Sequence, residues 1–365
     1  MTMGTCDARV LDTLVIGAGP AGLASSRALT LTGIRHLVLE RGSQPGQTWA
    51  DLYDSLVLHT ARPLSALPGL RFAKGTRLFP TRQDFVAYLE EFARRFTVPL
   101  RTNAAVTDLR RESNVWRARL ASGCDVAARS VVVATGIASN PHLPRLRGQS
   151  RFGGHMIHSA EYRRPDRFFG QRVLVIGAGN SGVDIALELA SAGVDVVFAG
   201  RRRSAMVPLT VAGIPSHYFG FALAPFFARK GCPRPPIIGT RLGAGLRANA
   251  IRWRSKLIEL TETGARFDDG EASSIDTVIL ATGYRPAVGF LNDLVRSDDC
   301  GFPERKGRIA SANQPNLYFV GHRYDARGAL YNIGRDAAAA ASLVKSTLCE
   351  THRTPTGIRP LHYGK

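Results

Sequence analysis

Two glycine-rich turns carry the most specific chemistry in this sequence. The first turn reads Gly17-Ala18-Gly19-Pro20-Ala21-Gly22, and the second reads Gly177-Ala178-Gly179-Asn180-Ser181-Gly182. In such a turn the first glycine permits a tight bend and the second lets the backbone approach a pyrophosphate at a helix N-terminus. The third lets the helix pack closely on a strand. Both turns therefore predict binding of a dinucleotide.

The residues about twenty positions further on distinguish the two nucleotides. After the first turn a strand over 36–39 ends at Glu40, whose carboxylate can accept hydrogen bonds from a ribose. After the second turn a strand over 194–199 runs instead toward Arg201, Arg202 and Ser204, and guanidinium groups suit a 2′-phosphate. The second nucleotide is therefore predicted to be NADP. A single glycine-rich turn also occurs as a plain joint between strand and helix, but two turns with opposite ribose-binding residues disfavour that interpretation.

The elements that must hold these turns follow the same order twice. Apolar strands over 11–16 and 173–176 precede the turns, and a helix follows each. Two further buried strands run into Ala-Thr-Gly at Thr135-Gly136 and Thr282-Gly283, as expected if each closes a nucleotide-binding unit. A strand over 316–320 ends at Gly321, and a helix over 334–348 could direct its N-terminus at the bound cofactor.

This order predicts an α/β fold with two Rossmann-like dinucleotide-binding domains, the NADP-binding domain being inserted in an FAD-binding domain. We place the two parts of the FAD-binding domain at 1–150 and 276–365. The NADP-binding domain occupies 151–275. The chain of 365 residues is long enough for two such domains.

The net charge and the distribution of basic residues limit the kinds of partner that we expect. The chain carries 48 basic and 29 acidic residues, a net charge of +19, but the arginines are scattered and form no recognised nucleic-acid motif. We expect a solvated basic surface that favours anionic cofactors, with no nucleic acid as partner. No apolar run reaches the ~20 residues of a membrane span and no signal-type segment opens the chain, so we predict no transmembrane segment and a cytoplasmic location. The oligomeric state is left open.

The 5 cysteines are odd in number and far apart. This spacing argues against a disulfide framework and against a Cys-x-x-Cys metal or redox site, so we expect free thiols and no metal. It also disfavours a pyridine-nucleotide disulfide reductase, which shares both dinucleotide-binding domains but needs a redox-active cysteine pair beside the flavin.

A further motif, directly before the second turn, carries a family resemblance. Phe152, Gly154, His158 and Tyr162 fit the pattern F-x-G-x-x-x-H-x-x-x-Y, and the segment 280–284, ending Ala-Thr-Gly-Tyr, is similar to a second signature. Both resemble the class B flavin-dependent monooxygenases. The resemblance extends over about 13–344 and is nearest to the YUCCA branch, whose flavin-covering block is similar to 53–59 and 79–89.

The resemblance implies FAD and NADPH as cofactors, and O2 and a small molecule as substrates. NADPH would reduce the flavin, and a C(4a)-(hydro)peroxyflavin would carry the oxygen. The nearest branch favours oxidative decarboxylation of a 2-oxo acid such as indole-3-pyruvate. Alternatives are an N- or S-oxygenating enzyme, a Baeyer-Villiger monooxygenase, which would carry Trp where this chain has Tyr162, and an NADPH-binding redox sensor.

The same resemblance indicates two functional histidines. His59 stands where amine-oxidising members carry Asn, and it is expected near the flavin or NADP, where its charge would favour a peroxide anion. A packed histidine at a strand end is the alternative. His158 is expected to link the domains rather than to transfer a proton. The other residues expected to contact the cofactors are Arg41, Thr48, Trp49, Thr60, Thr135, Gly136, Thr282, Gly283, Tyr284 and Gly321.

Overall fold

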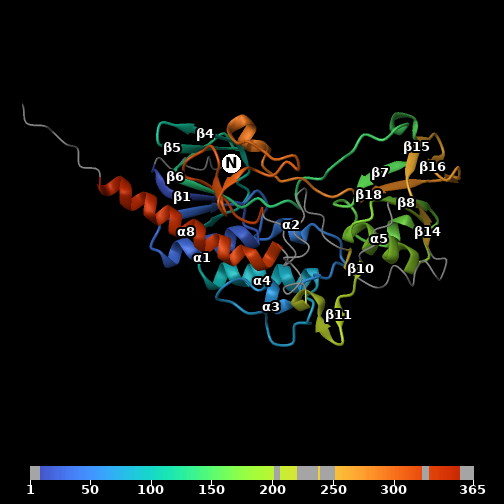
Figure 1. Cartoon of the computed structure of the whole chain (residues 1–365), viewed down its shortest axis with the longest axis horizontal. Coiled ribbons are helices and arrows are strands. Elements are labelled where there is room, and N and C mark those ends of the chain that lie inside the picture. Colours follow the sequence, from blue (N-terminus) through green and yellow to red (C-terminus); the bar gives the residue numbers. More distant parts are fainter. Residues whose placement is uncertain (1–8, 201–205, 220–236, 239–250, 323–328, 354–365) are drawn as a thin grey trace, which may run out of the picture.

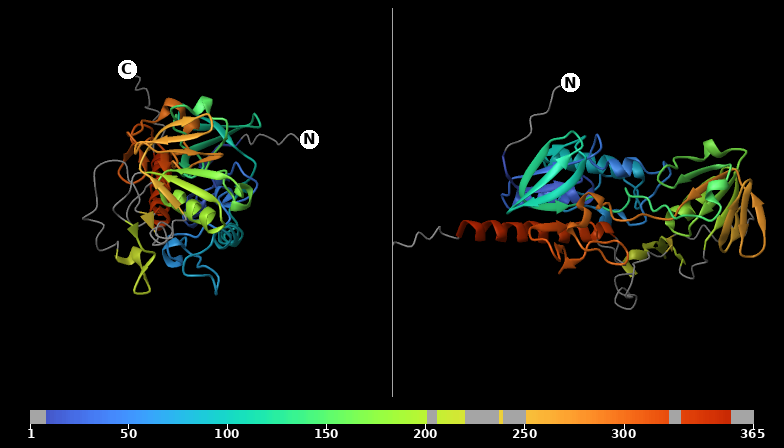
Figure 2. Two further views of the ribbon diagram at one scale, coloured as in Figure 1. Left: turned by 90° about the vertical axis from the view of Figure 1, so that its right-hand side faces the viewer. Right: turned by 90° about the horizontal axis from the view of Figure 1, so that it is seen from above.

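The computed structural model describes residues 9–200, 206–219, 237–238, 251–322 and 329–353. Two sheets with their covering elements lie at opposite ends of an elongated molecule (Figure 1), and the view from above shows the same separation (Figure 2). One sheet has nine strands and the other has five. Because parallel strands alternate with helices in both, the predicted α/β fold with two Rossmann-like units is confirmed.

The nine-stranded sheet is built around the first glycine-rich turn. Its parallel centre has the order β21-β6-β1-β2-β3, with β20 and β19 added at one edge and the β4–β5 hairpin paired to β6. The strands are β1 (Leu11–Ile16), β2 (His36–Leu39), β3 (Leu100–Arg101), β4 (Val106–Glu112), β5 (Val115–Leu120), β6 (Asp125–Val133), β19 (Arg305–Lys306), β20 (Ala310–Ser311) and β21 (Leu317–Phe319). Strands from both ends of the sequence thus share one sheet.

Helices cover one face of this sheet. They are α1 (Pro20–Leu31), α4 (Arg82–Arg95) and α8 (Ala329–Arg353), and they lie together in Figure 1. Leu23, Phe85 and Val344 are fully buried there. The helix predicted over 334–348 is longer at both ends, because its apolar face packs along α1 and this packing outweighs the low helix propensity of Gly334. Two short helices, α2 (Gln47–Ala50) and α3 (Arg62–Ser65), precede α4.

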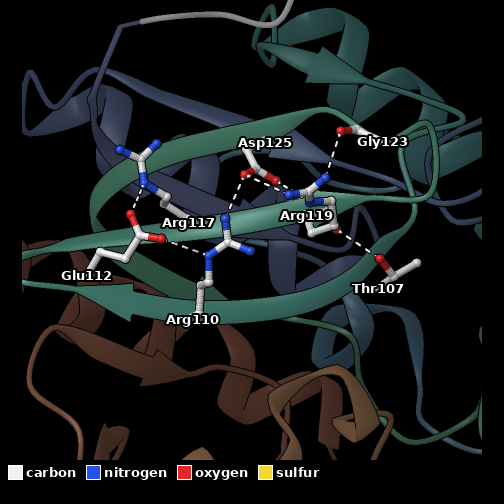
Figure 3. Close-up of polar contacts among 7 residues, drawn as sticks. All are labelled: Thr107, Arg110, Glu112, Arg117, Arg119, Gly123 and Asp125. Atoms are coloured by element: carbon white, nitrogen blue, oxygen red, sulfur yellow. Dashed lines mark hydrogen bonds and ion pairs between the residues drawn. The ribbon is translucent and has the colours of Figure 1, made fainter.

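The β4–β5 hairpin and the short helix η3 (Gly289–Leu294) pack on the opposite face, where Leu109, Trp116 and Leu291 are buried. Arginines on the outer side of the hairpin pair with carboxylates (Figure 3). Arg110 lies 2.9 Å from both Glu112 and Asp125, and Arg119 lies 2.6 Å from Asp125. These partly exposed pairs neutralise much of the local positive charge, so the arginines here do not form an open polyanion-binding surface.

The five-stranded sheet is parallel throughout and is built around the second glycine-rich turn. Its order is β14-β9-β8-β18-β7. The strands are β7 (His155–His158), β8 (Arg172–Ile176), β9 (Asp195–Ala199), β14 (Ile251–Arg254) and β18 (Thr277–Leu280). Helix α5 (Asn180–Ser191) covers one face, and the three-stranded sheet of β15 (Leu257–Thr261), β16 (Gly264–Phe267) and β17 (Ala272–Ser274) covers the other.

Short elements complete the described chain. They are η1 (Gln149–Arg151), η2 (Pro165–Phe168), β10 (Met206–Val207), β11 (Thr210–Val211), β12 (Ile214–Pro215) and β13 (Ile237–Ile238). Across the described ranges, no helix is long and apolar enough to cross a membrane, and no group of three or more His, Cys, Asp or Glu side chains could hold a metal ion.

Strand β18 affects where the boundary predicted at residue 276 should lie. It pairs with β7 and β8, so residues 277–280 belong to the five-stranded sheet, whereas the predicted boundary assigns everything from 276 onward to the FAD-binding domain. We propose that the chain returns to that domain after Leu280. The predicted start of the insertion, at 151, lies just before β7.

Candidate active site

The first glycine-rich turn leaves an opening at the N-terminus of α1. Gly17 has a φ of +100°, and a Cβ there would lie 2.8 Å from the carbonyl oxygen of Ala134. A Cβ on Gly22 would collide with the carbonyl oxygen of Gly17, so both positions require glycine. A Cβ on Gly19 would meet nothing within 4 Å. The space beside Gly19 therefore fits a pyrophosphate rather than protein.

The carboxylate of Glu40 is fixed beside this opening. Glu40 is buried, its Oε2 accepts a hydrogen bond from the amide of Ala18 at 2.7 Å, and its Oε1 accepts one from the amide of Gly42 at 2.8 Å. Because each carboxylate oxygen has two lone pairs, both retain acceptor capacity. The side chain is thus oriented to bind the hydroxyl groups of a ribose.

One pocket collects most residues that the sequence assigns to the first nucleotide. The predicted residues that line it are Gly17, Gly19, Pro20, Ala21, Glu40, Arg41, Thr48, Trp49, Thr135, Gly136 and Gly321. Lining residues that the sequence reasoning missed are Gly46, Gln47, Ala104, Ala105, Val106, Ile137, Ala138, Ser139, Ala287, Phe290, Leu330 and Ile333. Ala104 to Val106 follow the carboxyl end of β3, and this position at the end of a parallel strand is the signal that could have found them.

Residues far apart in sequence close the pocket. Trp49 packs edge-on against Phe85 of α4, with ring centroids 4.6 Å apart, and this contact holds the predicted flavin-contacting turn. Leu330 and Ile333 come from the first turns of α8, whose N-terminal end therefore faces the pocket. No cysteine is among the residues that line it.

The second glycine-rich turn repeats the same steric arrangement. Gly177 has a φ of +119° and its Cβ would collide with the carbonyl oxygen of Ala281, while a Cβ on Gly182 would collide with that of Gly177. A Cβ on Gly179 would again meet nothing within 4 Å. The N-terminus of α5, which begins at Asn180, thus faces an open space that fits a second pyrophosphate.

The residues predicted to bind the 2′-phosphate, Arg201, Arg202 and Ser204, lie outside the described residues. The structure adds an arginine on the neighbouring strand. The carbonyl oxygen of Arg254, at the end of β14, accepts a hydrogen bond of 3.1 Å from the amide of Gly200, the residue that follows β9. Its guanidinium lies over the ring of Phe267 and 3.7 Å from carboxylate oxygens of Asp269 and Glu271. Only strand pairing brings Arg254 here, so periodicity along the chain gave no signal for it.

The two motif segments of the five-stranded sheet meet at His158. This buried histidine ends β7; its Nε2 lies 3.1 Å from the carbonyl oxygen of Gly283, and its Nδ1 lies 3.1 Å from the amide of Ala160. Burial lowers the pKa of His158. The ring of Tyr284 packs edge-on against the imidazole. Gly283 and Tyr284 of the second signature thus contact His158, and Thr282 donates a hydrogen bond to the carbonyl oxygen of His142. None of the three lines the first pocket.

The structure brings His59 to the junction of the two domains, whereas the carbonyl oxygen of Thr60 accepts a hydrogen bond from the hydroxyl of Ser65 in its own segment. Neither His59 nor Thr60 lines the first pocket. The Nε2 atom of His59 lies 3.3 Å from Oδ2 of Asp184 on helix α5. The same carboxylate oxygen accepts a hydrogen bond of 3.0 Å from the hydroxyl of Tyr53. Asp184 and Tyr53 were missed by the sequence reasoning, since neither stands in a glycine-rich turn.

Tyr162, the last residue of the motif that begins at Phe152, also contacts helix α5. Tyr162 is buried, and its hydroxyl donates a hydrogen bond of 3.0 Å to Oε2 of Glu188. Burial and the nearby carboxylate raise the pKa of Tyr162. This tyrosine therefore stays protonated and acts as a hydrogen-bond donor between β7 and α5.

Two steric cradles for pyrophosphate, each between a parallel strand and a helix, define a flavoprotein with a second dinucleotide site. Residues 14–208 match the sequence model described as pyridine nucleotide-disulphide oxidoreductase, and residues 217–300 match that described as flavin-binding monooxygenase-like. Indole-3-pyruvate monooxygenase YUCCA1 of Oryza sativa subsp. japonica is 31% identical over 75% of this chain and 77% of its own length. YUCCA4 of the same plant is 32% identical over 89% and 85%.

Solved structures with a similar fold also include flavin-containing monooxygenases. A flavin-containing monooxygenase from Stenotrophomonas maltophilia has a TM-score of 0.80 and 25% identity, covering 93% of this chain and 99% of that one. The bacillithiol disulfide reductase of Bacillus cereus, at 23% identity and a TM-score of 0.73, shares the fold. The chain belongs to the class B flavin-dependent monooxygenases, near the YUCCA branch. It is an oxidoreductase that uses FAD and NADPH and acts with O2 on a small-molecule substrate.

The prediction that the cysteines are free thiols was wrong at one position. Cys300 is disulfide-bonded and Cys349 is a free thiol, so the expectation of free thiols was wrong for Cys300. Wide spacing in sequence does not prevent two cysteines from meeting in space. Cys300 is not among the residues that line the first pocket.

Proposed function

We propose that this monooxygenase catalyses the NADPH- and O2-dependent oxidative decarboxylation of a 2-oxo acid such as indole-3-pyruvate. The observation that carries the proposal is the similarity, at 31% and 32% identity, to two indole-3-pyruvate monooxygenases over 77% and 85% of their lengths. In this reaction one oxygen atom of O2 enters the new carboxylate and the other leaves as water. The bond between the carboxyl and carbonyl carbons breaks, CO2 is released, and NADPH supplies the two electrons.

The first pocket is proposed to hold FAD. The pyrophosphate would lie beside Gly19 at the N-terminus of α1, and Glu40 would bind the adenosine ribose. Trp49, Gly321 and the N-terminal end of α8 would then border the flavin ring. When bound, the flavin accepts hydride from NADPH and transfers oxygen from O2 to the substrate. The chain's own contribution is to orient the cofactor and exclude water from it.

The second turn is proposed to hold NADPH. Its pyrophosphate would lie beside Gly179, and Arg201, Arg202 and Ser204 would bind the 2′-phosphate. Arg254 is proposed to add a third guanidinium, because it ends the strand next to the ribose-binding position. A 2′-phosphate is absent from NADH, so these arginines would determine the preference for NADPH.

His59 is proposed to act where the two nucleotides approach each other. It comes from the FAD-binding side and contacts the helix that starts at the NADPH turn. A protonated imidazole at this place stabilises negative charge on oxygen. Negative charge on the transferred oxygen favours its attack on the carbonyl carbon of a 2-oxo acid.

Oxygen transfer to nitrogen or sulfur is the second candidate, and one observation favours it. Asp184 lies 3.3 Å from His59, so its carboxylate would offset the charge of a protonated imidazole. Attack by a nucleophilic amine or thioether does not need that charge. The two candidates therefore differ in product rather than in cofactor.

The deciding experiment supplies the FAD-loaded enzyme with NADPH, O2 and one compound of each class. Indole-3-pyruvate and phenylpyruvate test decarboxylation, and N,N-dimethylaniline and thioanisole test transfer to nitrogen and sulfur. We expect close to one CO2 for each NADPH consumed with a 2-oxo acid. Formation of an N-oxide or sulfoxide without CO2 would refute decarboxylation. Release of only hydrogen peroxide with every compound would support the redox-sensor alternative.

A further inference from the structure

Two carboxylates one helical turn apart on α5 each accept a hydrogen bond from a tyrosine. Tyr53 donates to Asp184 and Tyr162 donates to Glu188, both at 3.0 Å. Residues four positions apart lie on the same face of a helix, so both tyrosines meet one face of α5. Burial, with the adjacent carboxylates, raises the pKa of each tyrosine, and each hydroxyl therefore keeps its proton and donates it.

Asp184 differs from Glu188 in having a second side-chain partner. Its Oδ2, which accepts the hydrogen bond from Tyr53, also lies 3.3 Å from Nε2 of His59, and both side chains of this pair are partly exposed. His217, in the segment after β12, faces His59 as well. Burial lowers the pKa of His217, and the charge of His59 lowers it further, so His217 stays neutral.

Backbone contacts fix the segment that carries Tyr53. The amide of Asp54 donates to the carbonyl oxygen of Arg163 at 2.9 Å, and the guanidinium of Arg163 donates to the carbonyl oxygen of Leu52 at 2.9 Å. Arg163 directly follows Tyr162 of the motif. The segment between α2 and α3 is therefore held against the five-stranded domain on both sides of Tyr53, and Tyr53 in turn restricts the carboxylate of Asp184.

Asp184 connects His59 to the helix that begins at the second glycine-rich turn. The helix begins at Asn180 of the glycine-rich turn, so Asp184 lies one turn away from the end that faces the proposed NADPH pyrophosphate. The same helix thus holds a histidine of the FAD-binding side. Any displacement of α5 relative to the FAD-binding domain would separate Asp184 from His59.

We propose that Asp184 is the positioning residue of His59: Tyr53 fixes its carboxylate, and the carboxylate orients the imidazole only while the NADPH-binding helix is docked. This inference rests on the proposed role of His59 between flavin and nicotinamide. It adds that the orientation of His59 is set from the other domain. A ligand-dependent change in the position of α5 would therefore change the flavin environment.

A double-mutant cycle on hydride transfer tests the inference. FAD-loaded enzyme is mixed with NADPH without oxygen, and the bleaching of the flavin gives a limiting rate constant and a half-saturating NADPH concentration. We expect Asp184→Asn and His59→Asn each to lower the rate constant on the order of tenfold, because the reacting geometry is disturbed. The double variant should be no slower than the slower single variant, since both changes remove one interaction. The half-saturating concentration should change by less than about twofold.

Glu188→Gln is the matched control, because Glu188 accepts the same kind of tyrosine hydrogen bond one turn away. It should leave the rate constant within about twofold of the parent. If Glu188→Gln slows the reaction as much as Asp184→Asn, or if the two single effects multiply in the double variant, the positioning role is wrong. If His59→Asn does not slow reduction, the inference fails, whereas the proposed role of His59 in oxygen transfer is tested separately by the CO2 yield of the same variant with a 2-oxo acid. An effect of His59→Asn alone refutes only the role of Asp184. Should Asp184→Asn not retain FAD, Tyr53→Phe tests the same carboxylate and should slow reduction without adding to His59→Asn.

Discussion

The Nε2 atom of His158 lies 3.1 Å from the carbonyl oxygen of Gly283, and this contact joins two motifs that are 125 residues apart in sequence. A carbonyl oxygen can only accept, so Nε2 carries the proton. The amide of Ala160 can only donate, so Nδ1 carries none. The imidazole is therefore neutral, in agreement with the lowering of its pKa by burial. A neutral ring with both nitrogens engaged supports the predicted role of His158 as a link.

His158→Ala should destabilise the protein by about 2–3 kcal/mol, because it removes a buried ring and leaves a backbone carbonyl and an amide without their partner. Urea unfolding measures the loss. His155→Ala is the matched control: His155 lies on the same strand but is exposed, so the change should fall within about 0.5 kcal/mol. Equal losses in the two variants would contradict the linking role.

Gly19 and Gly179 provide a paired prediction for the two nucleotides. Their φ angles, −75° and −95°, suit alanine, and no protein atom lies within 4 Å of a Cβ at either position. Gly19→Ala should fold normally but weaken FAD binding by about tenfold or more, and Gly179→Ala should weaken NADP+ binding similarly, since the methyl group enters the proposed pyrophosphate space. Fluorescence titration of each nucleotide measures both.

Two results would contradict this prediction: loss of the other nucleotide, or loss of stability of the protein as a whole. Loss of FAD in Gly179→Ala, or a large drop in thermal stability in either variant, would place the methyl group against protein instead of cofactor. Gly22→Ala shows what such a clash looks like, because its Cβ would collide with the carbonyl oxygen of Gly17. We expect Gly22→Ala to fail to accumulate as folded protein.

Local patterns predicted the two nucleotide units well. The strand, turn and helix around Gly17 and Gly177 follow from glycine spacing and from short-range apolar periodicity, and Glu40 follows from its place at a strand end. The features that the sequence could not give depend on pairing between distant segments. Only the hydrogen bonds of β18 to β7 and β8 assign residues 277–280 to the five-stranded sheet.

The same reason explains the gaps in the predicted site. The resemblance predicted His59 near the flavin or NADP, but its partner Asp184 follows only from the packing of α5 against the segment 53–59. Arg254 lies beside Gly200 because β14 pairs with β9, and no local pattern encodes that pairing. Residues brought together by strand order or domain packing leave little signal in one sequence.

Arg254→Ala should raise the Michaelis constant for NADPH about tenfold and leave that for NADH nearly unchanged, because a guanidinium contact with the 2′-phosphate is lost. The double variant Arg201→Ala and Arg202→Ala should behave alike. Steady-state oxidation of each nucleotide gives the four constants. Arg252→Ala is the control, because Arg252 lies on the same strand but pairs at short range with Asp195, whereas Arg254 lies 3.7 Å from Asp269 and Glu271. This control should affect neither nucleotide. Equal losses with NADPH and NADH would refute a role of Arg254 at the phosphate.

His322 should make the stability of the FAD-binding domain depend on pH. It is buried beside Gly321, and burial, with the positive charge of Arg305, lowers its pKa to about 4. The unfolded chain binds a proton on this residue near pH 6.5, which the folded chain does not, so stability is complete above that pH and falls as the pH drops toward 4. At pH 4.5 the loss from this residue should be about 2.5 kcal/mol. Urea unfolding of the parent and of His322→Gln at pH 7 and pH 4.5 measures it: the parent should lose more stability than the variant, and equal losses would show that His322 is protonated in the folded protein.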